Sequence, residues 1–514
     1  MSALLLNRRL AALLVLPLAA AVTLTGCSST TMTTRPTSTG KPIVGGTLSV
    51  ARANLFEGFT LDQQTLNASL QISEAVMEPL IRTNPKGTKL EPGIAKNWAF
   101  NADNTQLTID LNPAATFSDG NPLTTKDVAF SVDTWKAGAN YGATFAVISS
   151  TEVVNTHTIK LDLAYPDSAL PAYLSWANAG IVPANFGGRT AEEFWQKPVG
   201  AGPFAVEKWS STGDIVLARN SHYYKKGQPY LDKVVSSFAS DSNSLSLQLK
   251  SGKVDVADEI SPIAARGLNQ SLMLPVIEHN TPLLLMNNQD PALSDPSVRQ
   301  AIAYALDYKS ILRAVYRSYG SKPVGALPTN LQNWAGPTTP YFSYDLAKAK
   351  KMISGKTVPP TLTFIYTATG DASLLAQIVA DNLAKIGITV ELKPQDAGTR
   401  FSNLSSGKYQ LASFAYNAIS PDVSDPISYI TSTSGMFTGF TSDAVDAQIK
   451  AYEQTTDAAA KQAAITAVQD IYLKQAPFVA LAHLKSLGAA QKSVAGIQLT
   501  LWGTYALEDI WKTK

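Results

Sequence analysis

Two carboxylates stand near the C-terminal end of the chain, in a short stretch bounded by prolines. Asp422 and Asp425 lie in the sequence PDVSDP, between Pro421 and Pro426. Proline and aspartate are typical of turns, because proline fixes φ and the aspartate side chain hydrogen-bonds to nearby backbone. A carboxylate is also able to pair with a cationic group of a ligand. The residue types alone predict a turn, and a binding role needs support from the rest of the chain.

The reactive side chains elsewhere form no recognised catalytic or metal-binding motif. The sequence has no HExxH pair of metal ligands and no GxSxG nucleophile elbow. SSGK at Ser405–Lys408 matches SxxK, but the KTG partner motif is missing. GAGPFA at Gly200–Ala205 resembles a GxGxxA loop, but Pro203 and FAVEKW indicate a turn into a strand. The histidines are not spaced as metal ligands: His157, His222, His279 and His483. We therefore expect no enzymatic activity, metal ion or cofactor.

The single cysteine, Cys27, follows an apolar run near the N-terminus. Two arginines precede Leu10–Leu24, LAALLVLPLAAAVTL, which is short for a membrane span and fits a signal peptide better. The run leads into LTGC, the lipobox pattern of an aliphatic residue, two small residues and cysteine. The sequence predicts a signal peptide over residues 1–26 and a diacylglycerol on Cys27 that holds the protein on a membrane face.

Charge and composition limit the class of the mature chain. Removal of residues 1–26 takes away two arginines and leaves equal numbers of basic and acidic residues, which argues against a nucleic-acid partner. Residues 27–42 are Ser/Thr-rich and predict a flexible tether. The chain is 45% hydrophobic and 16% charged, as in globular proteins, and its length suits about three domains.

Strand and helix patterns alternate along the globular part. GGTLSVA (Gly45–Ala51), QLTIDL (Gln106–Leu111) and TIKLDL (Thr158–Leu163) read as strands. Thr125 is expected to cap a helix over Lys126–Lys136, whose apolar residues recur on one side. These patterns predict a mixed α/β fold.

The C-terminal half carries the clearest signals. Asp295 is expected to cap a helix that begins with Pro296. TLTFIY (Thr361–Tyr366), a helix capped by Asp371, and ITVEL (Ile388–Leu392) predict a βαβ unit, with Gly387 ending the helix. Such a unit implies two parallel strands joined by a right-handed crossover. Another long helix should begin at Thr456 or Asp457 and end before Pro477.

Several collinear stretches, which together span nearly all of Gly45–Lys514, carry a family resemblance. They include GGTLSVARANLFEGFTLDQQ, ATFSDGNPLTTKDVAFSV, VGAGPFAVEKW, LSDPSVRQAIAYALDYKSIL and DNLAKIGITVELKPQD. In this order they resemble motifs of the extracytoplasmic solute-binding proteins of ABC importers, in the peptide/nickel-type group. The lipobox agrees with this resemblance.

The resemblance implies a periplasmic-binding-protein type II (Venus-flytrap) fold. In this fold a hinge connects two α/β lobes, and the peptide group has an extra third lobe. The first lobe would hold residues 43–77, 200–279 and 482–514, the second 78–199, and the third 280–481. Ligand would bind between the first and third lobes, which close by hinge motion. The protein would act as a membrane-anchored, extracytoplasmic monomer that delivers short peptides to an ABC permease.

The resemblance also implies binding residues. In this family an acid four residues before the proline of a D-x-x-[D/E]-P motif pairs with the α-ammonium of a peptide, and Asp422 matches it. Asp425 is expected to cap a helix that begins at Pro426. Tyr416 and Asn417 stand where the family usually has GW.

Three further residues are expected near the ligand. Phe56 and Phe59 lie in the loop after the first strand and are expected to line the cleft. Asn287 stands where the third lobe begins, and it would contact ligand or only fix the hinge backbone.

The ligand class stays open between a peptide and another small solute. The altered GW region supports an oligosaccharide or another non-peptide ligand. A metal chelate is a further possibility in this family, but few histidines and the absence of clustered ligands count against it. A lipid-anchored sensor or hydrolase is the remaining alternative, and the missing nucleophile arrangements argue against a hydrolase.

Overall fold

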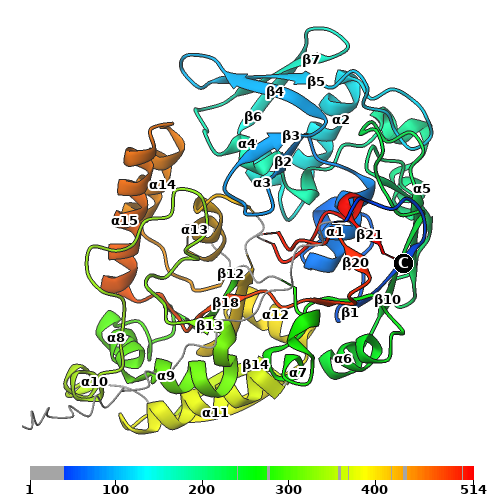
Figure 1. Ribbon diagram of the computed structural model, residues 1–514. Coiled ribbons are helices and arrows are strands. Elements are labelled where there is room, and N and C mark those ends of the chain that lie inside the picture. Colours follow the sequence, from blue (N-terminus) through cyan, green and yellow to red (C-terminus); the bar gives the residue numbers. More distant parts are fainter. Residues whose placement is uncertain are drawn as a thin grey trace, which may run out of the picture. The chain divides into compact units, whose positions relative to one another are not determined.

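The computed structural model of the chain (Figure 1) describes residues 40–239, 241–274, 278–356, 361–368, 370–417, 420–431, 437–500 and 502–513. The predicted signal peptide and Cys27 lie outside the described residues. Within the described part, no helix is both long and apolar enough to span a membrane. Three larger sheets each pack against a separate hydrophobic core, and we call them the first, second and third lobes in the order of their first strands.

The first lobe is built on a six-stranded sheet in the order β19-β11-β1-β10-β9-β8. β1 runs parallel to both of its neighbours, β10 and β11, which lie about two hundred residues further along the chain. The strands come from all three chain ranges expected for this lobe: β1 Thr47–Arg52, β8 Phe204–Lys208, β9 Ile215–Arg219, β10 Lys233–Phe238, β11 Val256–Ala257 and β19 Ala489–Ala490. Its helices include α1 Asn67–Val76, α6 Ser242–Lys250 and α7 Pro262–Ala265. β8 begins at Phe204, within GAGPFA and directly after Pro203, so the predicted turn into a strand is confirmed.

The second lobe is an antiparallel sheet in the order β4-β5-β7-β6, covered by α2. Its elements are β4 Ala95–Phe100, β5 Gln106–Leu111, β6 Ile148–Val153, β7 Thr158–Leu163, α2 Thr125–Lys136, α3 Gly142–Phe145, α4 Leu170–Tyr173 and α5 Ala191–Gln196. The cap of α2 is one residue earlier than predicted: Thr124 forms a capping box with Asp127, and the Thr124 N–H donates to Asp127 at 2.7 Å. Thr125 instead donates to the Asn155 carbonyl at 2.6 Å.

The third lobe has a seven-stranded sheet in the order β13-β18-β12-β16-β14-β15, with β17 also paired to β12. The strands are β12 Glu278–Met286, β13 Gly320–Ser321, β14 Thr361–Thr367, β15 Thr389–Gln395, β16 Leu411–Asn417, β17 Phe478–Ala480 and β18 His483–Lys485. β14 and β15 pair in parallel and are connected by α11 Gly370–Ala384, so the predicted βαβ unit is confirmed. β18 belongs to this sheet, although the predicted boundary assigned residues from 482 onward to the first lobe.

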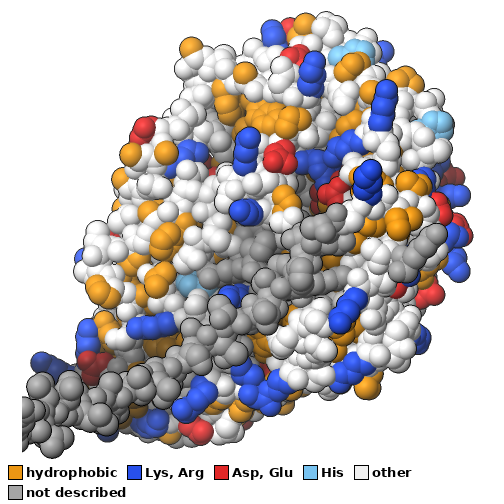
Figure 2. Space-filling model, in the orientation of Figure 1, with side chains coloured by type: hydrophobic (Ala, Val, Ile, Leu, Met, Phe, Trp, Pro, Cys, Tyr) orange, Lys and Arg blue, Asp and Glu red, His pale blue; other side chains and the backbone are white. Residues whose placement is uncertain are grey.

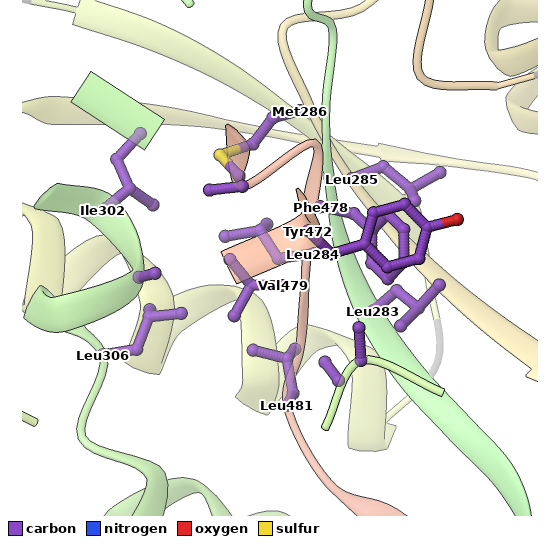
Figure 3. Close-up of a cluster of buried hydrophobic side chains, with 14 of the residues drawn as sticks. Leu283, Leu284, Leu285, Met286, Ile302, Leu306, Tyr472, Phe478, Val479 and Leu481 are labelled. Carbon is purple, nitrogen blue, oxygen red and sulfur yellow. The ribbon is translucent and has the colours of Figure 1, made fainter. Parts of the chain in front are cut away.

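Helices cover the third sheet, and two of them have the caps that the sequence predicts, whereas the predicted cap Asp371 lies in the first turn of α11. The helices are α8 Pro296–Ala305, α9 Tyr308–Ile311, α10 Leu346–Ile353, α11, α12 Ala397–Ser405, α13 Ser424–Ile430, α14 Asp443–Glu453 and α15 Ala458–Gln475. Asp295 accepts from the Ser297 N–H at 2.8 Å, and Asp457 accepts from the Ala460 N–H at 2.8 Å, as predicted. Figure 3 shows the core beneath them, where Leu283–Met286 of β12 meets Phe478 and Val479 of β17.

Lys and Arg side chains are scattered over the face of the molecule shown in Figure 2, with fewer Asp and Glu side chains and apolar groups between them.

Candidate functional site

A cavity of about 450 Å³ is lined by residues of both the first and the third lobes. This volume falls within the roughly 300–1,000 Å³ typical of small-molecule sites. The first-lobe wall includes Asn67, Glu259, Ile260 and Pro262. The third-lobe wall includes Asn280, Pro282, Tyr316, Tyr319, Thr367, Asp371, Ala372, Leu375, Arg400, Ser413, Phe414 and Ala415. Leu484–Leu487 and Gly503, from the segment that joins the two lobes, complete the lining.

The third-lobe wall lies at the end of the seven-stranded sheet where the parallel strands β14 and β16 terminate. Thr367 ends β14, and Ser413–Ala415 lie near the carboxyl end of β16, which runs parallel to β14. The antiparallel β12 begins at the same end, because Pro282 pairs with Ala415. Ligands of open α/β sheets bind outside the carboxyl ends of parallel strands, so the cavity occupies the position where this topology favours binding.

Asp371 contributes a carboxylate to the third-lobe wall from the first turn of α11. The N-terminal end of a helix favours negative charge, because its backbone N–H groups have no partners within the helix. Burial raises the pKa of Asp371, and the positive charge of Arg266 in the first lobe partly opposes this effect. The Oδ1 atom is buried and has no hydrogen-bond partner among the described residues.

Glu259 contributes a second carboxylate from the opposite, first-lobe wall. Its backbone has φ of +53°, a conformation that is uncommon for a residue with a side chain. Burial raises the pKa of Glu259, and a hydrogen bond of 2.6 Å from Asn54 Nδ2 to Oε2 opposes the rise. The preceding Asp258 is also buried, with its pKa raised by burial to about 8.

Two cations share the cavity with these acids. Arg400, on α12, donates from Nη1 to the Ser413 carbonyl at 2.8 Å, and burial lowers its pKa. The Arg400 Nε is buried without a hydrogen-bond partner among the described residues. Lys485, at the end of β18, lines the same space. Aromatic and aliphatic side chains fill the wall between charges, so the cavity suits a ligand that has both charges and apolar parts.

Asp422 is not among the lining residues. The residue is 3% exposed, and its carboxylate accepts three hydrogen bonds: from Ser424 N at 2.9 Å, Ser424 Oγ at 2.6 Å and the Tyr452 hydroxyl at 2.7 Å. The hydroxyls of Ser424 and Tyr173, a second-lobe residue, are 3.2 Å apart. The structure therefore places Asp422 in a buried network beside the second lobe, and its pairing with an ammonium stays a prediction.

The predicted cap at Asp425 is wrong. α13 begins at Ser424, so Asp425 lies in its first turn, and the cap-like contact is the one from Ser424 N–H to Asp422. The hydroxyl of Tyr416 donates to the Asp425 carboxylate, and both residues are buried. Tyr416 therefore anchors this turn inside the third lobe. The side chain of Asn417 lies outside the described residues.

The two predicted aromatic lining residues belong to the core of the first lobe. Phe56 and Phe59 are each 1% exposed and pack edge-to-face with each other and with Trp209. Three rings in such contact explain why this loop is buried. Asn287 donates from Nδ2 to the carbonyls of Gly407 and Tyr409 at 3.0 and 3.1 Å. It fixes backbone within the third lobe and is not part of the cavity lining.

Sequence reasoning missed the charged groups that do line the cavity. Asp371 was expected only to cap a helix, while Glu259 and Arg400 belong to no motif. Their signal is tertiary, because residues more than a hundred positions apart meet at one space. Among the described residues, no group of three or more His, Cys, Asp or Glu side chains is placed to hold a metal ion.

Comparisons with known proteins agree with this architecture. The model of the bacterial extracellular solute-binding proteins, family 5, matches residues 89–438. The probable di/tripeptide-binding protein 5 of Pseudomonas aeruginosa (strain UCBPP-PA14) is 24% identical, covering 90% of this chain and 95% of that protein. The probable D,D-dipeptide-binding periplasmic protein DdpA of Escherichia coli K12 is 26% identical, covering 87% and 92%. The solved structure of AgaA from A. tumefaciens R10 in complex with agropinic acid is 26% identical, with a TM-score of 0.82, covering 91% and 99%.

Proposed function

The chain belongs to the bacterial extracellular solute-binding proteins of family 5, and from this premise we propose that it captures short peptides between its first and third lobes and delivers them to an ABC permease. No bond is made or broken in this function. Its chemistry is reversible recognition, followed by presentation of the bound solute to a membrane partner. The family description places such proteins outside the cytoplasm.

The observation that carries this proposal is the cavity whose walls come from both lobes and hold carboxylates and cations together. A short peptide has one ammonium, one carboxylate and apolar side chains, so it can use each part of this lining. Two relatives are named for di- and tripeptides or for D,D-dipeptides, and the cavity volume suits solutes of that size.

Capture would proceed by closure of the first lobe over ligand held on the third. A ligand shifts a conformational equilibrium only when it contacts the closed form better than the open form. Asn67 and Glu259 supply such contacts from the first lobe, because they reach the ligand only when the walls are close. Affinity then depends on the combined contacts of both lobes.

We further infer, from the lipobox, that Cys27 carries the lipid that holds the protein beside its permease, and that the protein works as a monomer. The Ser/Thr-rich residues 28–42 would act as the tether. Mass spectrometry of the N-terminal peptide of the mature protein tests this point: the peptide should begin at Cys27 and carry the mass of the lipid, and an unmodified Cys27 would contradict lipidation.

A second candidate ligand is a small organic acid. The structure of AgaA contains agropinic acid, and Arg400 and Lys485 offer two cations to an acidic solute. Such a ligand would change the cargo and leave the transport role as proposed.

Native mass spectrometry of protein purified from its own host, followed by calorimetric titration with di-, tri- and tetrapeptides, tests the proposed cargo. We expect a co-purified peptide mass and saturable peptide binding. A co-purified non-peptide solute, together with no peptide binding after its removal, would overturn the peptide assignment.

A further inference from the structure

Two charged side chains in the cavity have buried polar atoms without a hydrogen-bond partner among the described residues. They are Oδ1 of Asp371 and Nε of Arg400. Buried polar atoms in folded proteins are nearly always hydrogen-bonded, so each exception needs an explanation. Both atoms belong to residues that line the same cavity. A ligand with complementary groups would satisfy both of them.

The two charges do not neutralise each other. Burial lowers the pKa of Arg400, and no carboxylate among the described residues opposes this effect. The positive charge that acts on Asp371 comes from Arg266 in the first lobe. The cavity therefore holds opposite charges that are not paired with each other, as a receptor for a zwitterion requires.

We propose that Asp371 and Arg400 are the charged anchors of the ligand: the Asp371 carboxylate binds an ammonium and the Arg400 guanidinium binds a carboxylate. This assignment rests on the proposed function and deepens it, because it specifies a zwitterionic solute with both termini free. It also transfers ammonium recognition from Asp422, whose carboxylate already accepts three hydrogen bonds inside the chain.

Both anchors belong to the third lobe, and this has a consequence for selectivity. Asp371 lies at the start of α11 and Arg400 on α12, and both helices contact β14. Their separation is therefore fixed by one lobe and does not depend on closure. This fixed separation selects the distance between the ligand's two termini before the first lobe closes. Peptides of one length should therefore bind better than shorter or longer ones.

The test is calorimetric titration of the wild-type protein, Asp371→Asn and Arg400→Gln with dialanine, trialanine and tetra-alanine. The best of these is compared with its N-acetyl and C-amide forms. For the wild type we expect each block to weaken binding at least about 30-fold. Asp371→Asn should weaken the free peptide similarly and leave the N-acetyl peptide unaffected, while Arg400→Gln should show the same pattern with the C-amide.

Two controls separate recognition from folding. Asp381→Asn removes an exposed carboxylate from the same helix as Asp371, and Arg313→Gln removes an exposed guanidinium from the same lobe as Arg400. Both should bind the free peptide as the wild type does. Each pairing is judged by comparing the effect of a side-chain substitution on the free peptide with its effect on the blocked peptide. A general loss of folded protein would weaken the binding of all peptides equally, so it would not produce this difference.

The outcomes distinguish this inference from the proposed function. Wild-type protein that binds free and blocked peptides equally would overturn the anchors and leave peptide capture standing. The same holds if Asp422→Asn, and not Asp371→Asn, removes the discrimination against N-acetyl peptide. Absence of binding for every peptide would overturn the proposed function itself.

Discussion

Tyr452 donates a hydrogen bond of 2.7 Å to Asp422 Oδ2, and both side chains are buried. The Tyr452 hydroxyl in turn accepts from Asn333 Nδ2 at 2.9 Å, and the Lys461 ammonium lies 4.5 Å from the centre of the Tyr452 ring. The network extends into the second lobe through Tyr173 and Ser424. Asp422 thus has a structural environment that its position in a proline turn did not indicate.

Tyr452→Phe should destabilise the protein, because it removes one of the three donors to a buried carboxylate. A hydrogen bond to a charged group is worth about 1.5–3 kcal/mol, so we expect a loss of that size in the free energy of unfolding, measured by urea denaturation. Tyr344→Phe, at a residue that is 42% exposed, is the matched control and should change little. Equal stability of the two variants would show that the Tyr452 hydroxyl contributes nothing.

Asp422→Asn and Asp371→Asn should differ in which property they change. Asp422→Asn disturbs an internal network, so its main effect should be a loss of about 1–3 kcal/mol in the free energy of unfolding. Asp371→Asn removes a charge from the cavity wall, so its main effect should be on peptide affinity. Calorimetry and denaturation of both variants compare these properties, and the reverse ranking would favour the sequence-based role of Asp422.

The buried acids between the second and third lobes should make stability depend on pH. Burial and the nearby negative charge of Asp422 raise the pKa of Asp167 to about 6. A hydrogen bond from the Ala169 N–H and the positive charge of Lys461 partly oppose this rise. Burial and the negative charges of Asp167 and Asp422 raise the pKa of Glu453 to about 7, and the positive charge of Lys461 partly opposes this rise. Tyr173 and Tyr452 also face this cluster. Unfolded Asp and Glu titrate near about 3.9 and 4.3, so the native state binds more protons between about pH 4 and 7.

The sign follows from proton linkage. Stability rises with pH where the unfolded state binds more protons, so here these two groups lower it as pH rises from about 4 through 7. Their stabilising contribution is complete below pH 4. Glu453→Gln should flatten this decline in urea denaturation across the same range, whereas Glu192→Gln, at an exposed site, should not. A wild-type stability that increases steadily from pH 4 to 7 would contradict the prediction.

Gly200→Ala should be costly because a side chain there has no room. A Cβ atom at Gly200 would lie 2.0 Å from the Val76 carbonyl oxygen, which belongs to the backbone at the end of α1. Forced packing of this kind costs about 1–3 kcal/mol or more. Gly398→Ala, inside α12, would meet only an ordinary contact of 3.5 Å and should gain up to about 1 kcal/mol in helix propensity. Thermal and urea unfolding of both variants should therefore shift in opposite directions.

Local signals in the sequence were sufficient for the elements. Asp295 with Pro296, and the β14–α11–β15 unit with Gly387, were readable because capping, periodicity and helix termination all act within a few residues. The resemblance supplied the order of the lobes. It could not place β18, since the pairing of His483–Lys485 with β12 and β13 depends on segments more than a hundred residues away.

The site was less predictable, for a physical reason. Phe56 and Phe59 look available for ligand in a loop, until Trp209 from a distant strand end covers them. Asp422 likewise meets Tyr452 only after folding. The residues that do line the cavity, Glu259 and Arg400, occur in ordinary polar segments, because a charge acquires its function from enclosure by distant chain and not from its neighbours in sequence.

Two apolar residues of the second-lobe range, Val182 and Phe194, lie in the hydrophobic core of the first lobe. Polar contacts join the second lobe to the third, such as Ser168 N to the Glu453 carbonyl at 3.0 Å. Under the proposed hinge motion, a rotation that opens the cleft would part the second lobe from the third and return Asp167 and Glu453 to water. Both carboxyls would then release protons near neutral pH and regain them on closure. We therefore expect solute capture to be linked to proton uptake, with a calorimetric heat that varies with the ionisation enthalpy of the buffer.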